Sequence, residues 1–299
     1  MRILIVCLRR IGDVFVTTAL ARSFKQKWPD AIIDWVVYEN TAFVLQNHPD
    51  ASQVFTLPSR PRGGDMWRLI LKIFMRYNLA FATQAGDRPA WIARVAAPRA
   101  YAQRSHARGS GFRNGILTQT VDPVGYVHAT QQVLELAGLV DVPVYPESQP
   151  PRPDFRGFTL PLLPYVVIHP RAAVRYKQWT MEGWRALIGN MKEAGLNVAC
   201  TGGSDTQETA YLDEVLGDLD VQRFDGQLSW PQLTALLSRA KAFVGIDTSV
   251  THLAASVGTQ TFAIFGPTDP RYWGPTPHSV EISDDALWQR RSPFQKRGN

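Results

Sequence analysis

The chain has 299 residues, enough for two domains that each bury a core of their own. Hydrophobic residues make up 45% of the sequence and charged residues 19%, which excludes a chain that is disordered throughout. The formal net charge of +6 suits an anionic partner, although an ordinary protein surface fits it equally well. No apolar run approaches about 18 residues and no signal peptide is visible, so we expect a cytoplasmic protein.

The first half of the chain alternates apolar, strand-like runs with helix-like segments. Asp13 opens a helical pattern that Pro29 ends. Strands that alternate with helices predict a parallel sheet built from βαβ units. The expected strands are 2–8, 31–37, 54–57 and 79–83, and the expected helices are 13–28 and 67–77.

Five prolines between 143 and 153 predict a linker, after which the alternating pattern starts again. We therefore expect an α/β protein with two tandem doubly wound domains and a cleft between them, with boundaries at 1–157 and 158–282 and a C-terminal tail at 283–299. In the second half, the expected strands are 165–168, 197–200, 242–246 and 261–265, and the expected helices are 180–194, 206–216, 230–239 and 250–257.

The two cysteines, Cys7 and Cys200, both lie in apolar runs expected to be strands. This setting predicts buried free thiols rather than a disulfide. Neither cysteine has a neighbouring Cys or His, so we expect no zinc site.

Ligands of open α/β sheets bind in the loops at the carboxyl ends of the strands. Chemistry is therefore expected in the loop 202–204 and in three loops with candidate side chains, 9–13, 169–177 and 247–252. In the first loop, Asp13 follows Gly12 and is either a helix cap or a general base, and the spacing favours neither. A position at a helix start predicts a lowered pKa for this carboxyl group.

The second loop, His169 to Lys177, gathers Arg171, Arg175 and Lys177. Cations there would neutralise a departing diphosphate, or they would form a solvated basic loop. The third loop follows the strand 242–246, and its acidic member, Asp247, suits a sugar or ribose hydroxyl better than a phosphate.

The start of the helix after the third loop predicts a phosphate site, because its first backbone N–H groups are free to bind an anion. His252, one turn further on, either reaches the phosphates or packs as a core histidine. Leu228, in a turn before another helix, is a candidate for packing against a flat base, although loop packing explains it as well. The residues expected to offer these amides are Thr248, Ser249 and Val250.

At these residues the sequence resembles glycosyltransferase family 9, the ADP-heptose:lipopolysaccharide heptosyltransferases. Four motifs carry the resemblance, in the family's order and at its spacing. They are R-I-L-I-V-x-L-R-R-I-G-D-V at the start, H-P-x-x-x-x-x-x-K-x-W at 169–179, G-x-D-T-x-x-x-H-L-A-A at 245–255 and F-G-P-T-D-P-x-x-W-G-P at 265–275.

The resemblance implies two Rossmann-like domains of the GT-B type, with the acceptor on the N-terminal domain and the donor on the C-terminal one. It implies an inverting transfer of heptose from ADP-L-glycero-D-manno-heptose to the inner core of lipopolysaccharide, without a metal or other cofactor. Asp13 matches the family's catalytic base, Lys177 its lysine on the donor phosphates and Asp247 the aspartate that contacts the heptose. The residues that match the family's other donor contacts are Leu228 at the adenine, Thr248, Ser249 and Val250 at the diphosphate, and His252 behind it.

The sequence departs from the family where many members carry Thr or Ser near the phosphates, because it has Arg171, Ala172 and Ala173 there. Arg171 is the expected substitute as a cation on the donor. Two alternatives to the inner core as acceptor remain open: another glycan and a surface protein of the autotransporter type. Another nucleotide sugar as donor and a non-catalytic binding module are further alternatives.

Several weaker signals concern the surface. Arg9, Arg10, Arg104 and Arg113 are candidates for contact with a phosphorylated acceptor, the last two in an expected basic loop from Arg99 to Arg113. Asp218 and Asp220 match a metal-binding D-x-D pair in form, but we expect a surface pair. We expect no nucleic-acid partner.

Arg68, Lys72 and Arg76 recur every four residues beside Trp67, Leu71 and Phe74. That pattern suits a basic amphipathic helix at the cytoplasmic face of the inner membrane, and it also suits an ordinary helix that covers a sheet.

Overall fold

The structure is a computed structural model, and it describes residues 1–104, 106, 110–122, 125, 127–275 and 279–283. Of residues 110, 112, 113 and 279–283 only the backbone is described. The chain forms two compact units, Met1–Arg152 and Pro153–Asn299, and the division falls within the proline-rich stretch.

The first unit is built on a six-stranded parallel sheet with the order β3-β2-β1-β4-β5-β6. This is the doubly wound arrangement, in which the strand order reverses between β1 and β4. The strands are β1 (Arg2–Cys7), β2 (Ile32–Tyr38), β3 (Gln53–Leu57), β4 (Leu79–Ala82), β5 (Arg99–Gln103) and β6 (Gln119–Val121).

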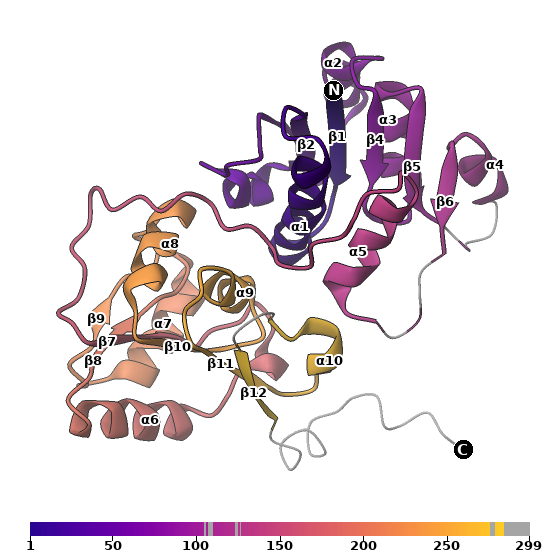
Figure 1. Cartoon of the computed structure of the whole chain (residues 1–299). Helices are drawn as coiled ribbons and strands as arrows, with labels where there is room; N and C mark the ends of the chain where they lie inside the picture. Colours follow the sequence, from indigo (N-terminus) through magenta and orange to yellow (C-terminus); the bar gives the residue numbers. More distant parts are fainter. Residues whose placement is uncertain (105, 107–109, 123–124, 126, 276–278, 284–299) are drawn as a thin grey trace, which may run out of the picture. The chain divides into compact units, whose positions relative to one another are not determined.

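Helices cover both faces of this sheet. α1 and α5 pack on each other on one face, and α2 and α3 pack on each other on the other face (Figure 1). β1 is buried over most of its length, as expected for a central parallel strand. The helices are α1 (Ile11–Lys27), a 3-10 helix η1 (Glu39–Leu45), α2 (Gly63–Ile73), α3 (Asp87–Ala96), α4 (Ser110–Gly115) and α5 (Ala129–Gly138).

α1 is buried on more than one side because the proline-rich stretch runs along it. The hydroxyl oxygen of Thr18 accepts from the backbone N–H of Gln149, and that of Ser23 accepts from the N–H of Tyr145. These two bonds satisfy backbone groups of a segment that belongs to no sheet. They also explain why polar side chains are fully buried in a helix that begins at the first candidate loop.

The second unit repeats the same design with the sheet order β12-β11-β10-β7-β8-β9. Here the strand order reverses between β7 and β10. The strands are β7 (Tyr165–His169), β8 (Asn197–Cys200), β9 (Gln222–Arg223), β10 (Ala242–Ile246), β11 (Thr261–Phe265) and β12 (Ser279–Ser283). The helices are a 3-10 helix η2 (Arg175–Lys177), α6 (Met181–Glu193), α7 (Thr206–Leu216), α8 (Trp230–Arg239), α9 (Ser249–Ser256) and α10 (Pro270–Trp273).

The predicted fold class, two doubly wound α/β domains, is confirmed, and Cys7 and Cys200 are buried free thiols as expected. The basic loop expected from Arg99 to Arg113 is wrong in part, because Arg99 opens β5 and Arg113 lies on α4. β5 was missed because its sequence, RAYAQ, has weak strand preference, and pairing with β4 decides its structure.

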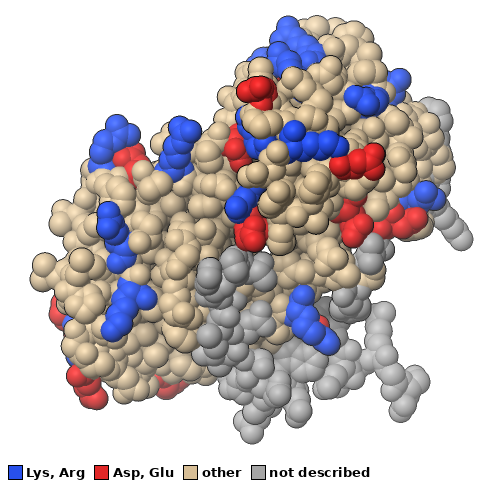
Figure 2. Space-filling model, viewed as in Figure 1, with Lys and Arg blue, Asp and Glu red and all other residues tan. Residues whose placement is uncertain are grey.

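Charged side chains of both signs are interspersed over the face drawn in Figure 2, where the described surface shows no continuous basic band. Among the helices in the described ranges, none is both long enough and apolar enough to cross a bilayer.

Candidate active site

The loops that follow β7 and β10 meet at the switch point of the second unit. β7 and β10 are neighbours in the sheet, so their carboxyl ends lie side by side. Lys177 comes from the first loop and Asp247 from the second, and Nζ of Lys177 donates to Oδ2 of Asp247 at 2.5 Å. The side chains are only 19% and 7% exposed. The two residues that sequence analysis places on the donor are therefore in direct contact.

The segment after Lys177 is anchored by Trp179. A Cβ at Gly183 would lie 2.6 Å from the Trp179 ring, so the ring packs directly on the first turn of α6. Trp179 also meets Trp184 edge to face, with 5.3 Å between ring centroids. Thr180 caps α6 by accepting from the N–H of Gly183 at 3.1 Å. These contacts explain the tryptophan of the K-x-W motif as the support of the lysine loop.

The turn between β10 and α9 is held by Thr251. Its hydroxyl donates to the carbonyl oxygen of Ile246 at 2.5 Å, and a Cβ at Gly245 would lie 3.0 Å from that hydroxyl oxygen. The glycine of the G-x-D-T motif thus leaves space for the bond that closes the turn.

α9 begins at Ser249, one residue earlier than expected, with Thr248 in an extended N-cap conformation. The first N–H groups of a helix have no partner inside it, and in α9 these belong to Ser249, Val250 and Thr251. They follow Asp247 closely in the chain, at the ligand-binding edge of the sheet. His252 follows on the same helix and is half-buried. The helix start therefore has its first amides one residue later than the expected set of Thr248, Ser249 and Val250, and such a helix start suits an anion.

His169 ends β7 at the same edge and is buried. Its Nδ1 lies 3.0 Å from the hydroxyl oxygen of Thr201, which follows β8. Burial lowers the pKa of His169 to about 4, so the ring is neutral at physiological pH. His169 therefore adds no positive charge to the cations in its loop.

Arg171 makes its contacts with α7 and with the loop before that helix. Its guanidinium carbon sits 5.6 Å from the centroid of the Tyr211 ring, and Tyr211 belongs to α7. The hydrogen bond from the backbone of Glu208 lowers the pKa of Asp205, and the charge of Arg171 adds slightly to that effect. The same charge only partly offsets the burial that raises the pKa of Glu208. Nε of Arg171 is buried and has no hydrogen-bond partner among the described residues.

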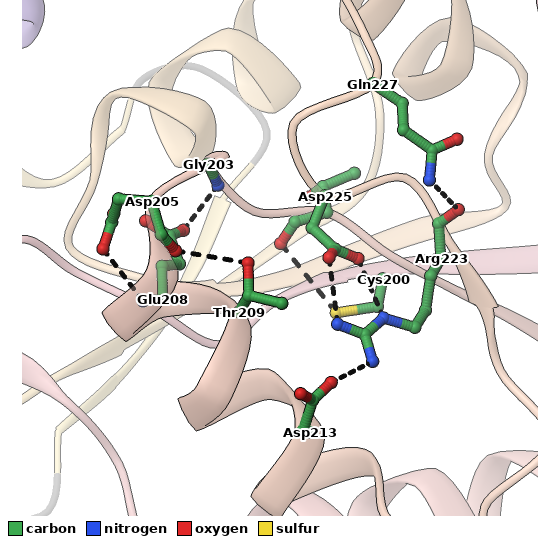
Figure 3. Close-up of polar contacts among 10 residues, drawn as sticks. Cys200, Gly203, Asp205, Glu208, Thr209, Asp213, Arg223, Asp225 and Gln227 are labelled. Carbon is green, nitrogen blue, oxygen red and sulfur yellow. Dashed lines mark hydrogen bonds and ion pairs between the residues drawn. The ribbon is translucent and has the colours of Figure 1, made fainter.

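Figure 3 shows the polar network around the start of α7, which sequence reasoning missed. Glu208 accepts from the backbone N–H of Gly203 at 2.6 Å, and burial raises the pKa of its carboxyl group. Asp205 caps α7 by accepting from the N–H of Glu208. The backbone N–H of Gly203 therefore donates to Glu208, although its loop is one of those expected to face a ligand.

A second part of this network fixes the turn that carries Leu228. Arg223 donates to both carboxylate oxygens of Asp225 and also to Asp213 of α7 (Figure 3). These bonds lower the pKa of Asp225. Gly226 follows with φ of 66°, a conformation that favours glycine. Leu228 is half-buried and follows this hydrogen-bonded turn at the carboxyl end of β9.

In the first unit, Asp13 follows β1 and is the third residue of α1. The N-cap is Arg10 and makes no side-chain cap bond, so Asp13 is not the N-cap residue, which was one of its two interpretations. Oδ1 of Asp13 lies 3.5 Å from Nη1 of Arg9, and the Asp13 side chain is 21% exposed. Arg9 and Arg10 are themselves exposed.

The expected lowering of the Asp13 pKa is wrong. Burial raises the pKa of this carboxyl group, and the charges of Arg9 and Arg10 and the neighbouring backbone groups only partly offset that effect. The sequence identifies the helix start but does not show how deeply the side chain is buried.

Gln84, another residue missed from the sequence, ties the Asp13 loop to the loop after β4. Its amide oxygen accepts from the N–H of Leu8 at 3.0 Å, and its amide nitrogen donates to the carbonyl oxygen of Leu8 at 2.9 Å. Thr83 adds a bond from its hydroxyl to the carbonyl oxygen of Val6. Hydrogen bonds thus join the end of β1 to the loop after β4, directly before Arg9.

The remaining candidates lie on the surface. Arg104 is exposed and pairs with Asp122 at 3.1 Å, and the side chain of Arg113 lies outside the described part of the chain. Asp218 and Asp220 pair with Arg185 and Lys192. Among the described residues, no group of three or more His, Cys, Asp or Glu side chains is placed to hold a metal ion.

Comparison with known proteins identifies the family. The model of glycosyltransferase family 9 (heptosyltransferase) matches residues 66–296, a range that leaves out the loop with Asp13. Lipopolysaccharide heptosyltransferase 3 of Escherichia coli is 26% identical over 282 residues, covering 88% of this chain and 83% of the relative. Lipopolysaccharide heptosyltransferase 1 of Pseudomonas aeruginosa is 28% identical over 294 residues, covering 92% and 81%.

Solved structures show the same fold. A family 9 glycosyltransferase from Veillonella parvula superposes with a TM-score of 0.82 at 17% identity, covering 97% of this chain and 87% of the other. The E. coli heptosyltransferase WaaC with ADP superposes with a TM-score of 0.79 at 20% identity, covering 95% and 93%. The chain therefore belongs to glycosyltransferase family 9, the heptosyltransferases, and is an enzyme of the transferase class.

Proposed function

We propose that this enzyme transfers heptose from ADP-L-glycero-D-manno-heptose to the inner core of lipopolysaccharide. Its relatives in E. coli and P. aeruginosa are named lipopolysaccharide heptosyltransferases. Solved proteins of the same fold hold ADP and ADP-2-deoxy-2-fluoro heptose. In this proposal the second unit binds the donor and the first unit binds the acceptor.

The observation that carries the proposal is the Lys177–Asp247 pair beside the start of α9. A cation and free amides at one place suit a diphosphate, and the adjacent carboxylate suits the hydroxyls of the attached sugar. In the proposed complex the amides of residues 248 to 250 contact the diphosphate, His252 supports it, Arg171 adds charge, and Leu228 packs on the adenine.

Asp13 is proposed as the general base. A raised pKa makes its carboxylate a stronger proton acceptor than an ordinary aspartate. The contact with Arg9 keeps the carboxylate oriented. Arg9 and Arg10, together with the more distant Arg104 and Arg113, are proposed to contact the phosphorylated inner core.

The proposed reaction is a single displacement. Asp13 takes the proton of an acceptor hydroxyl while that oxygen forms a bond to the anomeric carbon of the donor. The bond from that carbon to the diphosphate oxygen breaks, and its electron pair leaves with ADP, where Lys177 and the α9 amides stabilise the negative charge. Attack opposite to the leaving group inverts the anomeric centre. The protein's own cations take the charge-neutralising role in this scheme, so we propose a metal-independent transfer.

The donor half is tested by calorimetry with ADP, UDP and GDP. We expect ADP to bind most tightly, and we expect Lys177→Met to weaken ADP binding. Lys192→Met is the matched control because Lys192 also contacts an aspartate at 2.5 Å, but at the surface of α6. Equal affinity for the three nucleotides, or equal effects of the two substitutions, would contradict the donor assignment.

The acceptor half is tested by offering ADP-heptose with truncated lipopolysaccharide cores, with other glycans and with candidate autotransporter proteins. Transfer to a core that lacks heptose supports the proposal. Transfer only to another glycan or to a protein would replace the acceptor and leave the donor site in place.

A further inference from the structure

The outer face of α2 exposes a stripe of large apolar side chains. Trp67, Leu71 and Phe74 are 61%, 59% and 62% exposed, and Met75 after the helix is exposed as well. Their spacing of four and three residues places the first three on one side of the helix. An exposed apolar patch of this kind marks a surface that meets another molecule.

This stripe is additional to the face by which α2 covers the sheet. Leu69 and Ile73 are buried in the core of the first unit, and Met66 packs against that core. The interpretation of this segment as a helix that covers a sheet is therefore confirmed, and the helix also presents a second apolar face outwards.

A basic row runs beside the apolar stripe. Arg68 and Lys72 are exposed on the helix, and Arg76 continues the row after the helix ends. Asp65 is the one acidic side chain between residues 58 and 78. It lies 3.7 Å from Arg68 and accepts from the backbone N–H of Arg62. The five basic residues of this segment, which far exceed its acidic charge, are Arg60, Arg62, Arg68, Lys72 and Arg76.

We propose that the outer face of α2 docks on the surface of a bilayer rich in anionic lipids. Trp67, Leu71 and Phe74 would enter the region between headgroups and acyl chains, where aromatic side chains are favoured. Arg68, Lys72 and Arg76 would contact the headgroup phosphates. The need for such docking rests on the proposed function, because the proposed acceptor is a lipid.

The charge pattern favours a membrane over a second copy of the chain. A two-fold contact through this stripe would bring the basic rows of two copies close together, and like charges oppose such a contact. An anionic bilayer neutralises the same row.

The fold also gives this helix a suitable position. α2 starts after the carboxyl end of β3, and the Asp13 loop follows the carboxyl end of β1 in the same parallel sheet. α2 therefore begins at the edge of the sheet that carries the proposed base and runs towards the opposite edge, where Asn78 contacts Arg2 at the start of β1. Docking through α2 would hold the first unit, which carries the proposed base, at the bilayer that carries the acceptor.

The test is co-sedimentation of the full chain with vesicles of phosphatidylethanolamine and phosphatidylglycerol, without any substrate. Leu71→Ser should lower the partition coefficient about tenfold, because the bound protein would no longer bury this leucine side chain in the bilayer interface. Leu162→Ser is the matched control because Leu162 is 80% exposed in the other unit, and it should leave partition unchanged. Lys72→Glu should lower partition at least about fivefold, and the exposed Lys241→Glu should not.

Equal partition of all four variants, or undiminished binding to vesicles of phosphatidylcholine alone, would overturn the proposal. The stripe would belong to a dimer interface instead if the wild type had the mass of two chains in solution and did not bind vesicles, and if Leu71→Ser had the mass of one chain. Transfer to a soluble, deacylated core should be the same for Leu71→Ser as for wild type. Vesicle binding without any transfer would count against the proposed function and leave the docking surface intact.

Discussion

The ammonium group of Lys177 lies 2.5 Å from the carboxylate of Asp247, across the point where the strand order of the second sheet reverses. The two residues are separated by 70 positions in the chain, and only the pairing of β7 with β10 brings their loops together. Because both side chains are largely buried, each charge depends on the other for its stability. The pair is thus a largely buried polar contact, and in the proposed function it lies at the donor.

Lys177→Met should destabilise the second unit and abolish most activity. Removing the cation leaves the Asp247 carboxylate buried without its partner, at a cost of about 3 to 5 kcal/mol. Turnover should fall at least about a hundredfold with the loss of charge stabilisation on the leaving group. Urea unfolding and initial rates measure the two effects.

The double variant Lys177→Met/Asp247→Asn separates them. It should recover most of the lost stability, since no buried charge remains, while turnover stays low. Recovery of turnover together with stability would show that the pair serves the fold and not the reaction.

Asp13→Asn should lower turnover by about 10² to 10⁴, because the amide cannot accept the proton. In the wild type the rate should fall with acid as Asp13 becomes protonated. Burial raises the pKa of this carboxyl group, so the midpoint should lie above the ordinary aspartate value of about 3.9. Rates measured as kcat/KM across pH would show this limb in the wild type and not in the residual activity of Asp13→Asn. A midpoint below that value would contradict the assignment.

Gly226→Ala should disturb the turn that carries Leu228. The alanine Cβ would lie 2.6 Å from Cβ of Ser204 and 2.9 Å from its Cα, and φ of 66° is unfavourable for alanine. We expect a loss of about 2 kcal/mol or more in unfolding free energy, with weaker ADP binding.

Gly195→Ala is the control for this substitution. Gly195 has φ of 74° but no atom within 4 Å of an added Cβ, so only the backbone cost of about 1 to 2 kcal/mol applies. ADP affinity should stay unchanged. If both alanines weakened ADP binding equally, the Gly226 turn would have no particular part in the nucleotide site.

His48 should make the first unit sensitive to acid. Its Nδ1 accepts from the N–H of Asp50 and its Nε2 donates to the carbonyl oxygen of Gln149, an arrangement that requires a neutral ring. Burial lowers its pKa to about 4. The unfolded chain binds a proton near pH 6.5 and the folded chain does not, so stability is full above pH 6.5 and is lost as pH falls towards 4.

The loss attributable to His48 is at most about 3 kcal/mol over that range. Proton NMR of the imidazole provides the measurement, with the ring expected to stay neutral down to about pH 5. Titration of this ring with a midpoint near 6.5 would show that it is not buried as described.

Sequence patterns predicted much of this molecule because strands, loops and motifs are local. The apolar runs predict that the loops holding Lys177 and Asp247 follow buried strands, and parallel strands put such loops at one edge of the sheet. Gln84 and Glu208 escaped notice because their roles depend on partners: Gln84 bonds Leu8, 76 positions earlier, and Glu208 bonds a backbone amide. The pKa direction of Asp13 was wrong because burial arises from packing, which spacing does not reveal.

Mass spectrometry of the transfer product tests the whole account most directly. Wild-type enzyme, ADP-heptose and a purified inner core without heptose should give a core heavier by one heptose residue, with release of ADP. Asp13→Asn and Lys177→Met should give almost none under the same conditions, and Lys192→Met should match the wild type. Folded wild-type enzyme that leaves every truncated core unchanged, or Asp13→Asn that transfers at the wild-type rate, would contradict the account.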